Sequence, residues 1–117
     1  MEDNIIISAL NKVGITDLDF LIYMNSSRVK RYNMPVEYNI WGCWIDTDNK
    51  NNITNIRIIV PCVIDEQTLL INIHEYTHAY EAYLRLGETY MEDIERSEDT
   101  ARQNEQLYLA RKKKENE

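Results

Sequence analysis

The sequence predicts a single α+β domain in which a small antiparallel or mixed sheet is followed by two helices. Two stretches rich in β-branched and aromatic residues, 36–45 and 53–60, flank the polar run DTDNKNN, which indicates a hairpin. Two longer stretches, about 66–86 and 90–111, repeat apolar residues at helical spacing. A chain of 117 residues has room for one core, which we place at about 34–110.

The two ends of the chain carry weaker signals. Residues 3–13 have apolar side chains at helical spacing, and Gly14 is a suitable stop. Residues 20–23 (FLIY) are compatible with a strand and with a helical turn. The last six residues, 112–117, are strongly polar and are expected to fray.

Composition argues against several classes of partner. The net charge of −7 disfavours nucleic acid, and the basic run RKKK at 111–114 is better explained as the complement of a helix C-terminus. No apolar run reaches the roughly 18 residues needed to cross a bilayer, and the N-terminus is acidic where a signal peptide would be basic. We therefore expect a cytoplasmic protein with no nucleic-acid or membrane partner. Abundant Asn, Ile and Lys are typical of AT-rich bacterial phage or mobile-element genomes.

The cysteines and tryptophans all fall in or beside the apolar, strand-like stretches. Two cysteines, Cys43 and Cys62, are too few for a disulfide framework, so we expect buried free thiols rather than metal ligands. Trp41 and Trp44 are expected to fill the core or cover a sheet edge rather than to bind a ligand.

The segment HEYTH at 74–78 contains both histidines of the chain. Residues four apart share one face of a helix, so His74 and His78 can hold one metal ion while Glu75 reaches a water bound to it. Imidazole with oxygen ligands suits Zn²⁺. Catalytic zinc usually takes three protein ligands, and the chain has no third histidine. The missing ligand must be a carboxylate or, with less support, a thiolate.

With these residues the chain resembles the gluzincin metallopeptidases, in which HExxH on one helix is completed by a glutamate on the next. Their third-ligand region often reads E-x-x-A, and residues 98–101 (E-D-T-A) fit that pattern. Nineteen residues separate His78 from Glu98, which is similar to the thermolysin-like branch. The resemblance covers roughly 53–108 and implies a minimal zincin-like domain, a minigluzincin.

A rival for the third ligand is Glu95, which with Asp99 gives an E-x-x-x-D form that gluzincins also use. Helical phase favours Glu98, because it shares an inward face with Ala101, whereas Glu95 lies among acidic neighbours. An aspartate ligand, Asp93 or Asp99, has less support.

The resemblance further implies a peptidase acting on a peptide or protein substrate, with Zn²⁺ held by His74, His78 and Glu98. Glu75 would be the general base, and the strand at 53–60 would form the rim of the cleft and pair with the substrate. A catalytically weak zinc-binding interaction module and a zinc hydrolase of non-peptide amides are the alternatives.

The chain departs from the family pattern in two places. Arg102 stands where relatives often have an aspartate, and a guanidinium cannot accept a hydrogen bond from an imidazole. No histidine remains to stabilise an oxyanion, so tyrosine or arginine must do so; the candidates are Tyr83, Tyr90, Tyr108 and Arg102.

Overall fold

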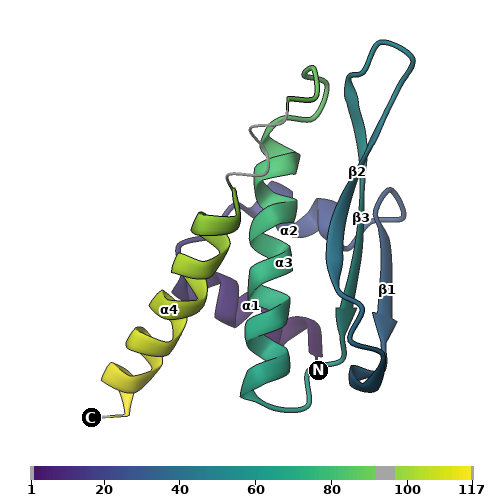
Figure 1. The fold of residues 1–117 in the computed structure, drawn as a ribbon. Helices are drawn as coiled ribbons and strands as arrows, with labels where there is room; N and C mark the ends of the chain where they lie inside the picture. Colours follow the sequence, from purple (N-terminus) through teal and green to yellow (C-terminus); the bar gives the residue numbers. More distant parts are fainter. Residues whose placement is uncertain (1, 92–96, 117) are drawn as a thin grey trace.

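A computed structural model of the chain describes residues 2–91 and 97–116. The predicted α+β class is confirmed: a three-stranded mixed sheet packs against helices (Figure 1). The elements, in chain order, are α1 (Glu2–Lys12), α2 (Leu18–Met24), β1 (Lys30–Met34), the 3₁₀ turn η1 (Val36–Tyr38), β2 (Gly42–Thr47), β3 (Ile53–Pro61), α3 (Glu66–Leu84) and α4 (Ser97–Glu115).

The sheet has the strand order β1-β3-β2. The expected hairpin is confirmed, because β2 and β3 pair antiparallel with Gly42 opposite Ile59. Strand β1 was not predicted; it pairs parallel with β3, with Lys30 opposite Arg57. Since β3 is therefore the central strand, the expectation that it forms the rim of the cleft is wrong. The edge strand on the site's side is β2.

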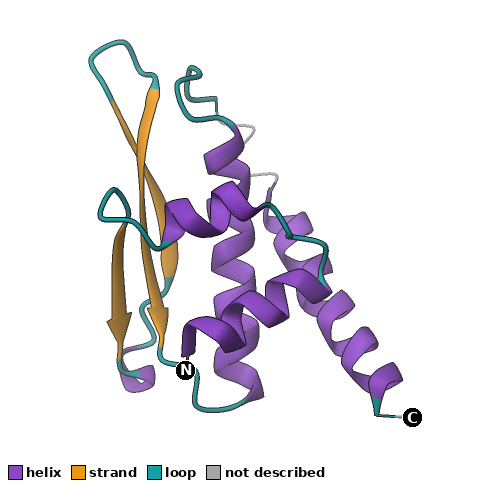
Figure 2. Cartoon of the chain, turned by 180° about the vertical axis from the view of Figure 1, so that it is seen from behind, coloured by secondary structure: helices purple, strands orange, loops and turns teal. Residues whose placement is uncertain are grey.

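The helices lie on one side of the sheet, with α3 next to the strands (Figures 1 and 2). The inward side chains of β3, among them Ile56 and Ile58, share a core with Ile73 of α3. Leu10 of α1 and Phe20 of α2 are fully buried in the same core. The core therefore includes residues well before position 34, which is where the sequence-based estimate of the core begins.

Local chemistry explains the bounds of α3. Asp65 accepts a hydrogen bond from the Thr68 backbone N–H at 2.8 Å, and the Thr68 hydroxyl bonds back to the Asp65 N–H at 3.0 Å, which is a capping box. The helix ends at Leu84, two residues before the expected bound, and Gly87 follows with a positive φ of 86°. The start at Glu66 is as predicted.

Two segments for which the sequence gives weak signals, residues 20–23 and the C-terminal tail, are helical. Residues 20–23 fall in α2, because the Asp17 side chain caps that helix by accepting from the Phe20 N–H at 3.2 Å. In the tail, where fraying is expected from the sequence, α4 continues to Glu115. Ion pairs hold this end: Lys112 lies 2.7 Å from Glu66, and Glu115 lies 2.8 Å from Lys12.

Among the described residues, none of the helices combines the length and the apolarity that crossing a membrane requires.

Candidate metal centre

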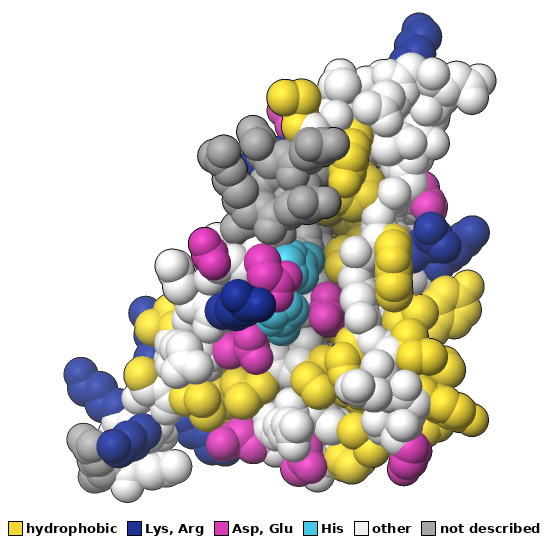
Figure 3. All heavy atoms as spheres, in the orientation of Figure 1, with side chains coloured by type: hydrophobic (Ala, Val, Ile, Leu, Met, Phe, Trp, Pro, Cys, Tyr) yellow, Lys and Arg dark blue, Asp and Glu magenta, His cyan; other side chains and the backbone are white. Residues whose placement is uncertain are grey.

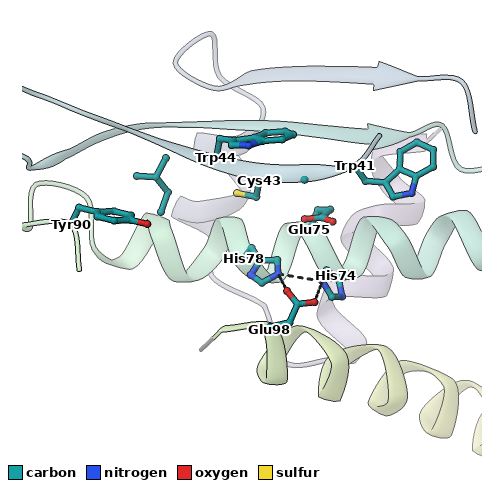
Figure 4. Close-up of a pocket in the computed structure, with 10 residues that line it drawn as sticks. Trp41, Cys43, Trp44, His74, Glu75, His78, Tyr90 and Glu98 are labelled. Atoms are coloured by element: carbon teal, nitrogen blue, oxygen red, sulfur yellow. Dashed lines mark hydrogen bonds and ion pairs between the residues drawn. The ribbon is translucent and has the colours of Figure 1, made fainter. Parts of the chain in front are cut away.

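Helix α3 places both histidines one turn apart on the side that faces α4 (Figure 4). Their rings meet edge to face, with centroids 4.9 Å apart. The two Nε2 atoms are separated by 3.2 Å. The HExxH spacing therefore directs two nitrogen donors at one point in space, as the sequence predicts.

Helix α4 brings Glu98 to that point. Its Oε1 lies 2.9 Å from Nε2 of His74, and its Oε2 lies 3.0 Å from Nε2 of His78. A tetrahedral site with metal–ligand bonds of about 2.0–2.1 Å has ligand atoms about 3.3 Å apart, so these separations fit an ion of that size. His74, His78 and Glu98 are the one group among the described residues whose donor atoms gather in this way.

Glu105 fixes the proton of His74. The Nδ1 atom of His74 lies 2.8 Å from Oε2 of Glu105, one turn beyond Ala101 on the same face of α4. A carboxylate can only accept, so Nδ1 carries a hydrogen, which leaves Nε2 as the ring nitrogen that can bind a metal ion beside Glu98. Carboxylates commonly orient metal-binding histidines in this manner.

Sequence reasoning missed this role of Glu105. The available signal was the inward stripe of α4, on which Glu98, Ala101, Glu105 and Tyr108 recur at spacings of three and four. Arg102 cannot accept a hydrogen bond from an imidazole. Glu105, the residue that follows Ala101 on this stripe, supplies the acceptor instead. A nearby hydrogen bond of 3.1 Å from Asn104 to the buried Thr77 hydroxyl also joins the two helices.

His78 is held in its neutral form. Burial lowers the pKa of its imidazole, the neighbouring His74 lowers that pKa further, and the Glu98 carboxylate opposes both effects. A neutral imidazole is the form that binds a metal ion.

A cavity of about 610 Å³ lies beside the histidines, between α3 and β2. The two histidine rings can be seen from outside in a hollow with acidic side chains around them (Figure 3). The lining residues are Trp41, Gly42, Cys43, Trp44, Ile45, His74, Glu75, His78, Tyr90 and Glu98. The wall opposite the histidines is therefore the edge strand.

Glu75 points from α3 toward β2 and is 9% exposed (Figure 4). Burial raises the pKa of its carboxyl to about 7; His74 opposes this shift, while the carboxylates of Glu98 and Glu105 add to it. A carboxyl group with a pKa near neutrality can both accept and release a proton, as general acid–base catalysis requires.

The structure revises the expectations for the cysteines and the tryptophans. Cys62 is exposed, so the expectation of a buried thiol is wrong there. Cys43 is partly buried, and burial together with the nearby Glu75 raises the pKa of its thiol to about 12, which disfavours the thiolate that zinc would need. Trp44 covers the edge strand as expected, with its ring against Gly42, but it also lines the cavity, as does Trp41.

The four candidates for oxyanion stabilisation differ in their position relative to the cavity. Tyr90 lines the cavity, and its backbone N–H is held by the Asn51 carbonyl at 2.8 Å. Tyr83 packs on Phe20 with ring centroids 5.3 Å apart. The remaining two are a core residue, Tyr108, and Arg102, whose side chain is 68% exposed and lies 3.7 Å from Glu98.

Only one of the three rival ligands, Asp99, belongs to the described residues. Glu95 and Asp93 lie outside the described residues, so the choice between Glu95 and Glu98 has a geometric basis only for Glu98. Asp99 is exposed on α4 and does not belong to the cluster.

Comparison of the chain with protein-family models, with curated proteins and with solved structures gives no match. What can be said of its chemistry therefore rests on the arrangement of its own residues: an α+β domain with a His-His-Glu cluster and a buried glutamate in one cavity.

Proposed function

We propose that the protein is a zinc-dependent metallopeptidase in which His74, His78 and Glu98 hold the ion and Glu75 is the general base. One observation carries this proposal: Glu98 on α4 meets both imidazoles of α3 beside a cavity that also contains Glu75. Two neutral imidazoles and a carboxylate leave one position of a tetrahedral site open, which is the arrangement of catalytic rather than structural zinc.

Zinc at this position would lower the pKa of a bound water toward about 7 and polarise the scissile carbonyl. Glu75 accepts the proton of the attacking water and delivers it to the leaving amine. Burial in the cavity, which raises the pKa of its carboxyl, makes it a stronger proton acceptor than an exposed glutamate. Glu105 would orient the His74 ring by accepting from Nδ1, so that Nε2 is available to the metal ion.

The edge strand β2 supplies a place for an extended substrate. Within the described residues β2 pairs with β3 alone, so its other edge keeps unpaired backbone donors and acceptors along the cavity. A peptide can add to such an edge as a further strand, and its alternate side chains then face the cavity wall. This role moves to β2 from the strand at 53–60, which is central in the sheet.

Tyr90 is the donor we assign to the developing oxyanion. Among the described tyrosines it alone lines the cavity, and its ring points from the end of the cavity toward the histidines (Figure 4). A phenol in this position can donate a hydrogen bond to the negative oxygen of the tetrahedral intermediate.

Hydrolysis of an unstructured protein such as casein tests the proposal. Zinc-loaded protein should cleave it, a chelator should stop the reaction, and added zinc should restore it. Glu75→Gln should bind zinc normally and lose about 10²–10⁴-fold in turnover, because an amide cannot take the proton. Glu88→Gln, at an exposed position outside the cavity, is the matched control.

Turnover retained by Glu75→Gln would contradict the assigned base. Zinc binding without cleavage of any peptide would instead favour the two alternatives, a zinc-binding interaction module or a hydrolase of other amides.

A further inference from the structure

Helix α4 has little apolar surface with which to hold its place. Its nineteen residues include five apolar side chains, Ala101, Leu107, Tyr108, Leu109 and Ala110. Of these, Ala101 and Tyr108 are buried, and Leu107 and Leu109 are partly buried against the core. Helical stability in proteins comes mostly from packing of an apolar face, and a helix of this length is marginal on its own in water.

Apart from the ion pair between Lys112 and Glu66, the polar side-chain contacts between α4 and α3 named here gather around the candidate metal centre. Glu98 meets both histidines at 2.9–3.0 Å, and Glu105 meets His74 at 2.8 Å. Asn104 adds a hydrogen bond to Thr77 between them. These contacts all lie in the N-terminal half of α4, and the axes of the two helices separate toward its C-terminal end (Figure 1).

The C-terminal half packs Leu107, Tyr108 and Leu109 against the core, and its further contacts are exposed ion pairs. Lys112 and Glu66 are 40% and 48% exposed, and Glu115 of the second pair is 57% exposed. Exposed pairs of this kind are screened by salt and contribute little to stability. They cannot by themselves keep a polar helix docked.

A cation at the centre would make the docking of α4 more favourable. Docking α4 brings the carboxylates of Glu98 and Glu105 to the same histidine, His74, and close to the buried Glu75. Carboxylates gathered in a partly buried place repel one another and lose hydration. A divalent ion between Glu98 and the histidines reverses the sign of this interaction, because it binds the carboxylate and both rings at once.

We propose that metal binding is what docks α4, so that the metal-free chain keeps its sheet and α1–α3 while α4 detaches. Metal availability then switches the proposed peptidase between an assembled and an open site. The inference rests on the metal centre of the proposed function but does not depend on peptide hydrolysis.

Hydrogen exchange followed by mass spectrometry on the full chain tests this. At free Zn²⁺ about 100-fold above its dissociation constant, peptides from 97–116 should exchange about 100-fold more slowly than in chelator, whereas peptides from β3 should change by no more than a few-fold. Protection of 97–116 should rise with the zinc-binding curve. Mg²⁺, which does not favour imidazole, should give no protection.

Two variants distinguish the effect of the metal on α4 from the effects of catalytic activity and of the Lys112–Glu66 ion pair. Glu75→Gln should show the same zinc-dependent protection of α4, although it is expected to be inactive. Lys112→Ala, which removes the ion pair to Glu66, should leave that protection within a few-fold of wild type.

Zinc binding with no change in the exchange of 97–116 would overturn the inference and leave the proposed function intact. Loss of protection throughout β3 and α4 together in chelator would also overturn it, because the metal would then hold the whole fold. Release of α4 by Lys112→Ala in the presence of zinc would overturn it as well. Zinc-dependent docking in a protein that cleaves nothing would refute the proposed peptidase alone.

Discussion

Glu105 accepts a hydrogen bond from Nδ1 of His74 over 2.8 Å, and this contact decides which ring nitrogen of His74 carries the proton. It links the middle of α4 to the first histidine of the HExxH segment. The same carboxylate also contributes to the raised pKa of Glu75. One residue outside the recognised motif therefore acts on two residues within it.

Replacing Glu105 tests that relationship. Glu105→Ala should raise the zinc dissociation constant about 10–100-fold, because the His74 ring loses the partner that fixes its tautomer and orientation. Glu105→Gln should recover part of the affinity, since its amide oxygen can accept the same hydrogen bond. Competition with a chromophoric chelator measures the change, and Gln106→Ala, the exposed next residue, is the control. Equal affinities for Glu105→Ala and Gln106→Ala would refute the role.

The third ligand can be assigned by a pair of variants three residues apart. Glu98→Ala should weaken zinc binding by at least about 100-fold, because a two-imidazole site lacks its oxygen ligand. Glu95→Ala should bind zinc as the wild type does. Metal content after dialysis distinguishes them, and the reverse result would reassign the ligand to Glu95.

The role of Tyr90 predicts a loss of turnover without a loss of binding. Tyr90→Phe should lower kcat by about 10²-fold or more, the usual effect of removing one oxyanion donor, and should leave KM within a few-fold. Tyr83→Phe, on a ring that packs against Phe20, should change neither constant. A rise in KM at constant kcat in Tyr90→Phe would show that the hydroxyl binds substrate rather than the transition state.

The cap of α3 predicts a pH-dependent contribution to stability. Hydrogen bonds from the Thr68 backbone N–H and hydroxyl lower the pKa of Asp65. A carboxyl whose pKa is lowered in the folded state stabilises the fold above its unfolded pKa of about 3.9, and this stabilisation is lost as pH falls through the folded pKa. Asp65→Ala should therefore lower Tm at pH 7, and its difference from wild type should shrink below about pH 4.

Asp65→Asn is the matched control for this effect. Asparagine is also a good N-cap but does not titrate, so the variant should keep much of the wild-type Tm at pH 7 without the acid-dependent loss. Thermal unfolding followed by circular dichroism between pH 2.5 and pH 7 measures all three proteins. A gap between wild type and Asp65→Ala that is constant over this range would contradict the role of the carboxylate.

Features with a local signal could be predicted from the sequence. The polar turn at 46–52 predicts the hairpin, and the capping residues Asp65 and Thr68 predict the start of α3. Helical periodicity alone predicts that Glu98 faces inward. Each of these features is determined by residues that are close to one another in the sequence.

Features that depend on distant parts of the chain were missed. Strand β1 pairs parallel with β3 across more than twenty residues, and its sequence KRYNM has no strong alternation to reveal it. Its presence makes β3 central and leaves β2 as the edge at the cavity. The function of Glu105 likewise depends on how α4 crosses α3, which periodicity cannot supply.

X-ray absorption at the zinc edge of the loaded protein tests the central claim most directly, that two imidazoles and a carboxylate hold one ion. We predict one zinc per chain with nitrogen and oxygen neighbours at about 2.0–2.1 Å, including the scattering pattern of two imidazoles. A sulfur neighbour at about 2.3 Å would bring Cys43 or Cys62 into the site and contradict the assignment, and so would a site with fewer than two imidazoles.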